Sequence, residues 1–329
     1  MRPGGEERAL LLRLAQGPVT GVALAGELGV TRAAVWKRIA ALRDAGIPIQ
    51  AHVRDGYALT QPLDLLDADA IRAALPVPLR TQVAALDLLW SIDSSNSELL
   101  RRPTPARGCA VLLAERQTGG RGRRGRLWAS PLAAHVYLSL ARGFRGGLAR
   151  LAGLSLAAGV AACEALHAQG FGAVRLKWPN DLVVARGGTL HKLGGLLVEG
   201  GGEAAGLSRA VLGIGVNVRM PTRVAAAIDQ PWIDLAGLAP NPPARNRLVA
   251  ELLAHLLPAL DVFESAGLEP FLERYAQWDA LAGREVVVCE DAQRWNARAL
   301  GIAVDGALRV RAGSGCERRV HAGDVSVRA

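Results

Sequence analysis

The sequence predicts a multidomain protein of three folded units. These are a small helical unit ending in a β-hairpin, a central α/β or α+β domain around one large sheet, and a small C-terminal β-barrel. Apolar residues at helical spacing precede the hairpin signal Arg54-Asp-Gly-Tyr57. Strand-like and helix-like segments alternate over residues 84–277, whereas residues 278–329 are rich in strands. The 329 residues, 50% of them hydrophobic, can bury a sizeable core.

Composition narrows the possible partners and compartments. The formal net charge of +9 favours an anionic partner, either nucleic acid or a phosphorylated ligand. The N-terminal residues lack the apolar segment of a signal peptide, and the uncharged run Leu151–Cys163 is too short to span a bilayer. We therefore expect a cytoplasmic protein without a membrane partner. Neither a zinc site nor a disulfide framework is expected, since the four cysteines are far apart: Cys109, Cys163, Cys289 and Cys316.

Residues 1–62 are predicted to form a winged helix-turn-helix. Apolar spacing predicts three helices, over residues 6–16, 21–28 and 32–45. Thr20 and Thr31 stand where the second and third helices need N-caps, and Gly29-Val30 provides the tight turn between them. Asp55-Gly56 favours a type I′ turn, so a β-hairpin wing should follow. Two short helices around a glycine turn followed by a wing are typical of this DNA-binding motif.

The third predicted helix carries the candidate DNA contacts. Its opening residues are small and polar, which allows close approach to base edges in a major groove. The helix contains several basic residues and only one acidic residue, Asp44, at its end. A solvated helix face has a similar composition, but the combination with the turn and wing favours DNA binding. The candidates are Thr31, Arg32, Ala33, Ala34, Lys37 and Arg38.

A linker with one short helix, residues 63–83, is expected to lead into the central domain at residues 84–277. Periodicity predicts five strands there: Ala110–Glu115, Val136–Ala141, Val174–Trp178, Leu193–Glu199 and Arg209–Val218. Helices are predicted over Glu98–Arg102, Leu148–Ala168, Asn246–Ala266 and Glu269–Ala276. Residues 278–329 should form the barrel from Glu285–Cys289, Ala297–Ala303, Leu308–Ala312 and Arg318–Val320.

The segment Gly120–Arg126, whose sequence is GRGRRGR, is the most informative part of the chain. Glycine allows a backbone to approach a ligand closely, and arginine supplies a permanent charge with a fork of donors. The spacing also fits a dinucleotide fingerprint, but no helix is predicted to start at Gly125, as that fingerprint requires. The loop therefore predicts a small-anion site, with a basic nucleic-acid patch as the alternative.

Three further motifs carry polar groups at the ends of predicted elements. Ile92–Asn96 supplies hydroxyls and an amide before a helix. Lys177–Asp181 ends a strand at a proline, and His191–Gly195 enters the next one. Taken separately, these motifs also fit a helix cap, a turn and a solvated lysine.

Together the motifs resemble those of one family, the biotin–protein ligases. The resemblance spans about Leu10 to Arg328, and the helix-turn-helix with the β-rich tail is similar to the bifunctional bacterial form, which is both biotin operon repressor and biotin–[acetyl-CoA-carboxylase] ligase. It implies a class II synthetase-like biotin/lipoate ligase domain with a mixed sheet, and an SH3-like barrel. The segment Ala185–His191 is longer than the family leads us to expect. The motifs are Ile92–Asn96, Gln117–Trp128, Lys177–Asp181, Lys192–Glu199 and Gly213–Asn217.

The resemblance implies a two-step reaction. Biotin and ATP give biotinyl-5′-AMP and pyrophosphate, and biotin is then transferred to a lysine of the biotin carboxyl carrier protein of acetyl-CoA carboxylase. The first step sets a carboxylate against a phosphate, so fixed cations should carry the catalysis. The implied cations are Arg121, Arg123 and Lys192, and Asp181 is expected to steer or deprotonate the acceptor lysine. Mg²⁺ is expected on the ATP phosphates, with no ligand in the chain named.

The binding residues follow from the same resemblance. The neutral ureido head of biotin needs paired donors and acceptors. Trp232 matches a tryptophan expected near adenine, although a core or interface tryptophan would look the same in sequence. The implied biotin-binding residues are Ser94, Ser95, Asn96, Gln117, Arg121, Gly122, Arg123, Lys192 and Gly195. The implied nucleotide-binding residues are Arg123, Asn180, Asp181, Lys192, Asn217 and Trp232.

Several readings of the function stay open. The family's regulatory form binds biotin operator DNA as a homodimer once the adenylate is bound, and a two-fold operator requires such a dimer. The alternatives are a ligase with a non-functional DNA-binding domain, a lipoate–protein ligase, and a regulator that senses a ligand without ligation. Intact Arg121, Asp181 and Lys192 argue against the last of these.

Overall fold

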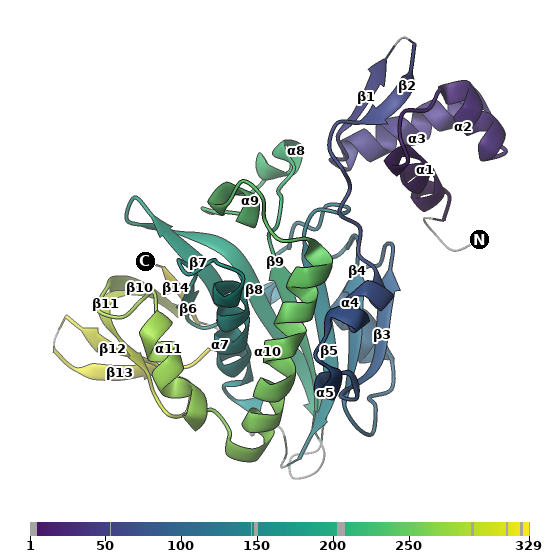
Figure 1. The fold of residues 1–329 in the computed structure, drawn as a ribbon. Coiled ribbons are helices and arrows are strands. Elements are labelled where there is room, and N and C mark those ends of the chain that lie inside the picture. Colours follow the sequence, from purple (N-terminus) through teal and green to yellow (C-terminus); the bar gives the residue numbers. More distant parts are fainter. Residues whose placement is uncertain are drawn as a thin grey trace.

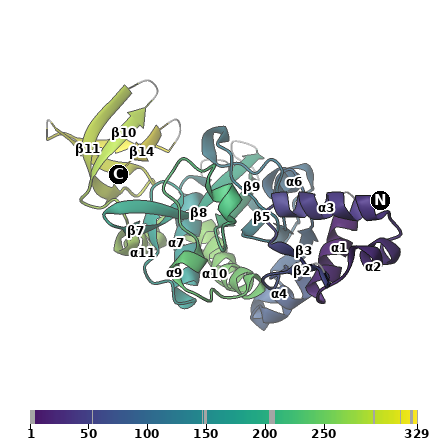
Figure 2. The ribbon, with the colours of Figure 1, turned by 90° about the horizontal axis from the view of Figure 1, so that it is seen from above.

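The structure is a computed structural model, and it describes residues 5–52, 54–145, 147, 151–202, 208–290, 293–313, 315–322 and 325–328. A central domain carries the N-terminal helical domain at one end and a small β domain at the other (Figures 1 and 2). This arrangement confirms the predicted multidomain architecture.

The N-terminal domain has the predicted helices and wing. Its elements are α1 Gly5–Ala15, α2 Gly21–Glu27, α3 Arg32–Asp44, β1 Ile49–His52 and β2 Gly56–Leu59. Thr20 and Thr31 cap α2 and α3 as predicted, since each Oγ1 accepts a backbone N–H at 3.2 Å. Gly56, the first residue of β2, has a φ of +80° that favours glycine.

The central sheet is mixed and has seven strands in the order β3-β4-β5-β9-β8-β7-β6. Only β3 and β4 are parallel, and every other neighbouring pair is antiparallel. The strands are β3 Val83–Leu89, β4 Cys109–Ala114, β5 Val136–Phe144, β6 Arg175–Lys177, β7 Asp181–Arg186, β8 Thr189–Gly202 and β9 Ser208–Val216.

The sequence analysis missed two of these strands. It ended the linker at residue 83, where β3 begins, and it took the start of β7 as part of a turn. The pairing of Lys177 with Asp181 leaves only three residues for that turn, so β7 starts at once. The predicted linker is largely helical, with α4 Ala68–Ala74 and α5 Val77–Arg80.

Helices cover the two faces of the sheet unequally. The long helices α7 Leu154–Ala168 and α10 Arg245–Ala266 lie side by side across one face, where the main hydrophobic core forms (Figure 1). Among the helices that the structure describes, α6 Ser95–Arg101 alone packs on the other face, through a small cluster around Leu99. The first predicted residues of α7, 148–150, lie outside the described residues, and Gly153, with a φ of +83°, precedes its start. The short helices are η1 Arg123–Gly125, α8 Thr222–Ala225 and α9 Leu235–Leu238.

The C-terminal region forms a small antiparallel β domain of five strands. It follows η3 Glu269–Phe271 and α11 Leu272–Trp278, which together replace the single predicted helix. The strand order is β13-β12-β11-β10-β14, and the sequence analysis missed only the last strand in the chain. The strands are β10 Glu285–Glu290, β11 Gln293–Ile302, β12 Leu308–Ala312, β13 Glu317–Val320 and β14 Val325–Arg328.

A buried ion pair fastens the segment after the wing to the central domain. Arg245 Nη2 and Glu115 Oε2 are 2.8 Å apart, and the two side chains are only 1% and 2% exposed. The Arg245 guanidinium also donates to the carbonyl oxygen of Asp64, and Glu115 Oε1 accepts the Leu66 N–H at 2.6 Å. The pair thereby satisfies backbone groups of the connecting segment as well as each other.

The N-terminal domain also contacts the central domain directly. Trp90 Nε1 and the Arg116 guanidinium both donate to the Glu7 carboxylate, at 2.7 and 3.1 Å. Leu132 belongs to the hydrophobic core of the N-terminal domain.

Within the described ranges, no helix is both long and apolar enough to cross a membrane. The four cysteines are free, with Cys109 and Cys163 buried.

Removing the charge of Glu115 should destabilise the protein strongly. We expect Glu115→Gln to lower the free energy of unfolding by about 3–5 kcal/mol, because Arg245 would remain charged and buried without its partner. Glu317→Gln is the control, since its pair with Arg309 is about 40% exposed on both sides and, like most surface ion pairs, should contribute little to stability. Urea titration followed by tryptophan fluorescence measures both, and equal midpoints for the two variants would contradict the role assigned to the buried pair.

Candidate active site

The polar residues of the first motif meet Gln117 at the carboxyl ends of the two parallel strands. The parallel pairing of β3 and β4 continues beyond both strands as a bridge between Ile92 and Gln117. Gln117 Oε1 therefore accepts both the backbone N–H and the hydroxyl of Ser95, at 2.8 and 3.0 Å. Ser94 caps α6 with its hydroxyl. Parallel register thus brings together residues more than twenty positions apart.

Asn96 and Ser139 complete a buried network of neutral polar groups. Ser139 Oγ lies 2.8 Å from Ser95 Oγ and 2.6 Å from Asn96 Oδ1. Gln117 Nε2 donates to Ser130 Oγ at 3.2 Å. Such a network of donors and acceptors suits a neutral polar ligand rather than an ion. The sequence analysis missed Ser139 and Ser130, because neither lies in a motif that suggests chemistry.

Glycines on β9 make room for the side chains of the site. A Cβ on Gly213 would lie 2.3 Å from Asn96 Oδ1, and a Cβ on Gly215 would lie 2.7 Å from the Trp128 indole. The two glycines alternate along one strand, so both open the same face of the sheet. Asn96 and Trp128 therefore lie directly against the β9 backbone.

Lys192 and Asp181 form an ion pair at the centre of this face. Their Nζ and Oδ1 atoms are 2.7 Å apart, and both side chains are about four-fifths buried. A bulge at Leu193 shifts the β7–β8 register, so that Lys192 pairs with Val183, two residues from Asp181. Lys192 Nζ also lies 5.4 Å from the centre of the Trp128 ring.

Arg121 forms a second ion pair, with a residue that the sequence analysis quoted without assigning a role. Its guanidinium donates to both carboxylate oxygens of Glu199, at 2.9 and 3.0 Å. Glu199 Oε2 also accepts the Asn96 Nδ2–H at 2.9 Å, which links the charged and neutral parts of the site. The sequence signal was the glutamate at the end of the Lys192–Glu199 motif, on the strand that carries Lys192.

The glycine–arginine loop folds back on itself and also reaches the C-terminal domain. Trp128 N–H donates to the Gly120 carbonyl, while Arg123 donates to the backbone carbonyl of Ala322. Burial lowers the pKa of Arg123, and the nearby negative charge of Asp181 partly opposes that shift. Leu127 is 91% exposed at the loop's end. Arg123 therefore lies within electrostatic reach of the Lys192–Asp181 pair, but its guanidinium also contacts the C-terminal domain.

The two amides expected at the nucleotide hold backbone segments together in the structure. Asn180 Nδ2 donates to the Leu196 carbonyl at 2.7 Å, and Asn217 Nδ2 donates to the Ile233 carbonyl at 3.1 Å. Trp232 pairs with Lys192 as a β-bridge and is partly exposed, which excludes the alternative of a fully buried core tryptophan. Gly195 lies close to the ion pair, since its Cβ would be 3.2 Å from Lys192 Cε.

The buried indole N–H of Trp128 has no hydrogen-bond partner in the described part of the chain. Buried polar groups of native proteins are usually paired, and an unpaired donor at a site can be reserved for a ligand. Trp128 therefore belongs to the site, although the sequence analysis gave it no role of its own. Gly122 lies in the same loop and donates its N–H to the Arg126 carbonyl.

The candidate DNA-binding residues separate into two groups on α3. Thr31, Arg32, Ala33 and Lys37 are exposed, whereas Ala34 is half-buried. Arg38 turns toward α1 and pairs with Glu6. Trp36, which the sequence analysis did not mention, is 65% exposed.

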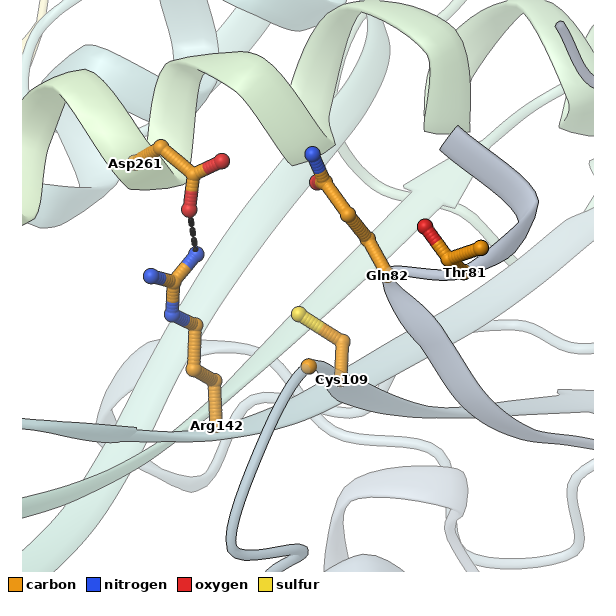
Figure 3. A pocket seen from close by; sticks show the side chains of 6 residues that line it. Thr81, Gln82, Cys109, Arg142 and Asp261 are labelled. Carbon is orange, nitrogen blue, oxygen red and sulfur yellow. Dashed lines mark hydrogen bonds and ion pairs between the residues drawn. The ribbon is translucent and has the colours of Figure 1, made fainter. Parts of the chain in front are cut away.

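A separate pocket lies at the opposite end of the central sheet (Figure 3). The pocket opens where β3 and β4 begin, away from the loops that carry the site. Arg142 in this pocket donates to Asp261 at 2.6 Å and to Glu264, so its charge is balanced within the protein. The lining residues are Thr81, Gln82, Gly108, Cys109, Arg142 and Asp261.

Three family models match separate parts of the chain. Residues 91–217 match the biotin/lipoate A/B protein ligase family, residues 7–58 match an HTH domain, and residues 282–328 match the biotin protein ligase C terminal domain. These matches agree with the three folded units of the structure.

Curated relatives and solved structures agree with the family models. The bifunctional ligase/repressor BirA of Salmonella typhimurium is 40% identical over 81% of this chain and 80% of its own length. The protein of the same name from Escherichia coli is 37% identical over 84% of this chain and 83% of its own. The biotin protein ligase of Aquifex aeolicus in complex with biotin and ATP has a TM-score of 0.62 at 23% identity, covering 74% of this chain and 99% of that chain, and shares its fold. The chain belongs to the family of bifunctional biotin ligases and repressors.

Proposed function

We propose that this chain joins biotin to ATP, giving biotinyl-5′-AMP and pyrophosphate, and then transfers biotin to a lysine of the biotin carboxyl carrier protein of acetyl-CoA carboxylase. The observation that carries the proposal is the Lys192–Asp181 ion pair against Trp128, beside the buried neutral network around Gln117. One part of the site suits a neutral polar head, and the other suits charged reactants.

In the first step, a biotin carboxylate oxygen attacks the α-phosphorus of ATP. The new O–P bond replaces the bond to the bridging oxygen, and pyrophosphate leaves with its electron pair. The main obstacle is repulsion between two anions, so Arg121, Arg123 and Lys192 would act by offsetting that charge. Without ligands, Lys192 and Arg121 are each paired with a carboxylate. The incoming anions would share or take over these cations.

The neutral network would bind the ureido group of biotin. Hydroxyls and amides gather at the N-terminus of α6, supplied by Ser94, Ser95, Asn96 and Gln117. Gly195 would allow biotin to approach the backbone closely. A lipoyl dithiolane ring offers no matching donors, so it would leave buried polar groups unpaired. This difference supports biotin over lipoate as the substrate.

In the second step, the amine of the carrier lysine attacks the acyl carbon of biotinyl-5′-AMP. A C–N bond forms, AMP leaves with the electrons of the C–O bond, and the amine must lose a proton. Asp181 is the carboxylate that would steer this amine or accept its proton. Asn180, Asn217 and Trp232 would shape the nucleotide side, the two asparagines by holding the strands that surround Lys192.

Magnesium would accompany the ATP phosphates and reduce their charge. Among the described residues, no three or more histidine, cysteine, aspartate or glutamate side chains gather as a metal site. Protein-bound Mg²⁺ usually needs only one or two carboxylates, because phosphates and water complete its shell. The chain's own contribution to the phosphates would come from Arg123 and Lys192.

The chain would also repress transcription as a biotin-dependent regulator in the cytoplasm. Exposed Thr31, Arg32, Ala33 and Lys37 on α3 support DNA binding by the winged helix-turn-helix. A homodimer formed when the adenylate is bound would match a two-fold biotin operator. The alternative is a ligase whose DNA-binding domain no longer functions.

Removing the charge of Lys192 should slow adenylate formation. We expect Lys192→Gln to lower the rate of pyrophosphate release roughly 100- to 1,000-fold, because one preorganised cation is lost from the transition state. Arg126→Gln is the control, since Arg126 is an exposed arginine of the same loop and should keep the normal rate. Equal rates for the two variants would exclude Lys192 from the chemistry.

Removing the charge of Asp181 should mainly impair the transfer step. We expect Asp181→Asn to slow transfer from preformed biotinyl-5′-AMP to the carrier domain by roughly 100-fold or more, as for a lost general base. Single-turnover mass spectrometry of the carrier separates this step from adenylate formation. Unimpaired transfer by the variant would remove the proposed role of Asp181.

Adenylate formation should change the oligomeric state. We expect sedimentation velocity to show a monomer with no ligand and a dimer with biotin and ATP together, because only a species that binds the adenylate preferentially is stabilised by it. Biotin with a non-hydrolysable ATP analogue is the control. A monomer that persists while biotinyl-5′-AMP accumulates would contradict a two-fold repressor.

A further inference from the structure

Trp36 is a large apolar side chain left exposed on the helix that is proposed to bind DNA. Val35, Ile39 and Leu42 on the same helix are buried in the N-terminal core, whereas Trp36 is 65% exposed. Within the described part of the chain, Trp36 is not among the residues packed against that core. Core packing therefore does not account for a tryptophan at this position.

The surroundings of Trp36 leave its indole accessible. Two of its four neighbours on the helix surface are alanines, Ala33 and Ala40, and a third, Ile39, is buried in the core. Alanine adds little bulk, so an incoming surface could reach the indole. Gly29 and Thr31, in the turn before α3, are also small and exposed.

The charges around Trp36 are positive. Arg32 precedes it by one turn and is exposed, and Lys37 follows it directly and is exposed. The nearest acid along this helix is Asp44 at its end, which pairs with Arg223. An apolar group flanked by cations complements the phosphate-lined major groove of DNA, where cations contact phosphates and apolar groups contact bases.

We propose that Trp36 is a specificity-determining residue that contacts the C5-methyl group of a thymine in the major groove of the operator. This inference rests on the proposed DNA-binding function of α3. The thymine methyl is the apolar group that base pairs present in the major groove, so it is the natural partner of an apolar side chain there. Lys37, by contrast, would contribute mainly through phosphates.

The experiment uses the full-length protein with biotin and ATP. Duplexes are selected from a random-sequence library by wild type, Trp36→Ala, Trp36→Phe and Lys37→Ala. The site selected by wild type is then rebuilt with deoxyuridine in place of each thymine in turn, which removes one methyl group at a time. Biotin transfer to the carrier is measured for every variant, and it should be unchanged because α3 is remote from Lys192.

We expect deoxyuridine at one position of a half-site, and at its symmetric position in the other, to weaken wild-type binding about five- to tenfold and to leave Trp36→Ala binding unaffected. Trp36→Ala should lose its base preference at that position, whereas Trp36→Phe should retain it. Lys37→Ala should select the wild-type site but bind all duplexes more weakly, with a reduced salt dependence. These contrasts separate base contact from general electrostatic binding.

Three outcomes overturn the inference, and they are distinguishable. If wild type selects no sequence, the proposed DNA-binding function fails and the role of Trp36 fails with it. If wild type selects a site and Trp36→Ala selects the same site with the same deoxyuridine response, only the role of Trp36 fails. If Trp36→Ala no longer forms a dimer but keeps the wild-type base preference, the indole would instead belong to a contact between two copies of the chain.

Discussion

The candidate site depends on the register of the central sheet, because the antiparallel pairing of β7, β8 and β9 decides which side chains can meet. The bulge at Leu193 sets Lys192 on the face that carries Asp181, and the alternating Gly213 and Gly215 leave that face open. Asn96 and Trp128 occupy the space that two side chains would otherwise fill. A one-residue shift in the register of β8 would turn Lys192 to the face covered by α7 and α10. The same shift in β9 would put Ile214 and Val216 where the glycines now lie.

The charged side chains of the site neutralise one another in ion pairs. Three cations sit near two carboxylates, and Lys192 and Arg121 each hold one of them at hydrogen-bond distance. A partly buried cation without a partner would be costly, so these pairs stabilise the site while no ligand is bound. An incoming anion would have to compete with Asp181 for Lys192 and with Glu199 for Arg121. The amides and hydroxyls of the neutral network already exchange hydrogen bonds among themselves, so a polar ligand would have to replace some of these bonds.

One short segment after β4, residues 115–117, contacts three different parts of the molecule. Glu115 binds Arg245 and the segment that follows the wing, Arg116 binds Glu7 of the N-terminal domain, and Gln117 binds Ser95 in the site. Glu115 lies at a bend directly after β4, and the side chains of these three neighbours contact three different parts of the molecule. The N-terminal domain is therefore attached within a few residues of the neutral polar network around Gln117, through both charged and hydrophobic contacts.

The sequence by itself determined the features that depend on local chemistry. Helix caps at Thr20 and Thr31 and the glycine–arginine loop follow from the preferences of neighbouring residues, and the motifs around Lys192 identified the family. Tertiary structure alone decided the long-range partners. Arg121 and Glu199 are 78 positions apart, and Arg38 faces Glu6 rather than an open helix surface. Strand β3, Val83–Leu89, was missed because the predicted linker extended to residue 83, where the strand begins. The sequence pattern predicts which face of an element a residue occupies. Sheet register and domain packing determine which atoms lie opposite that residue.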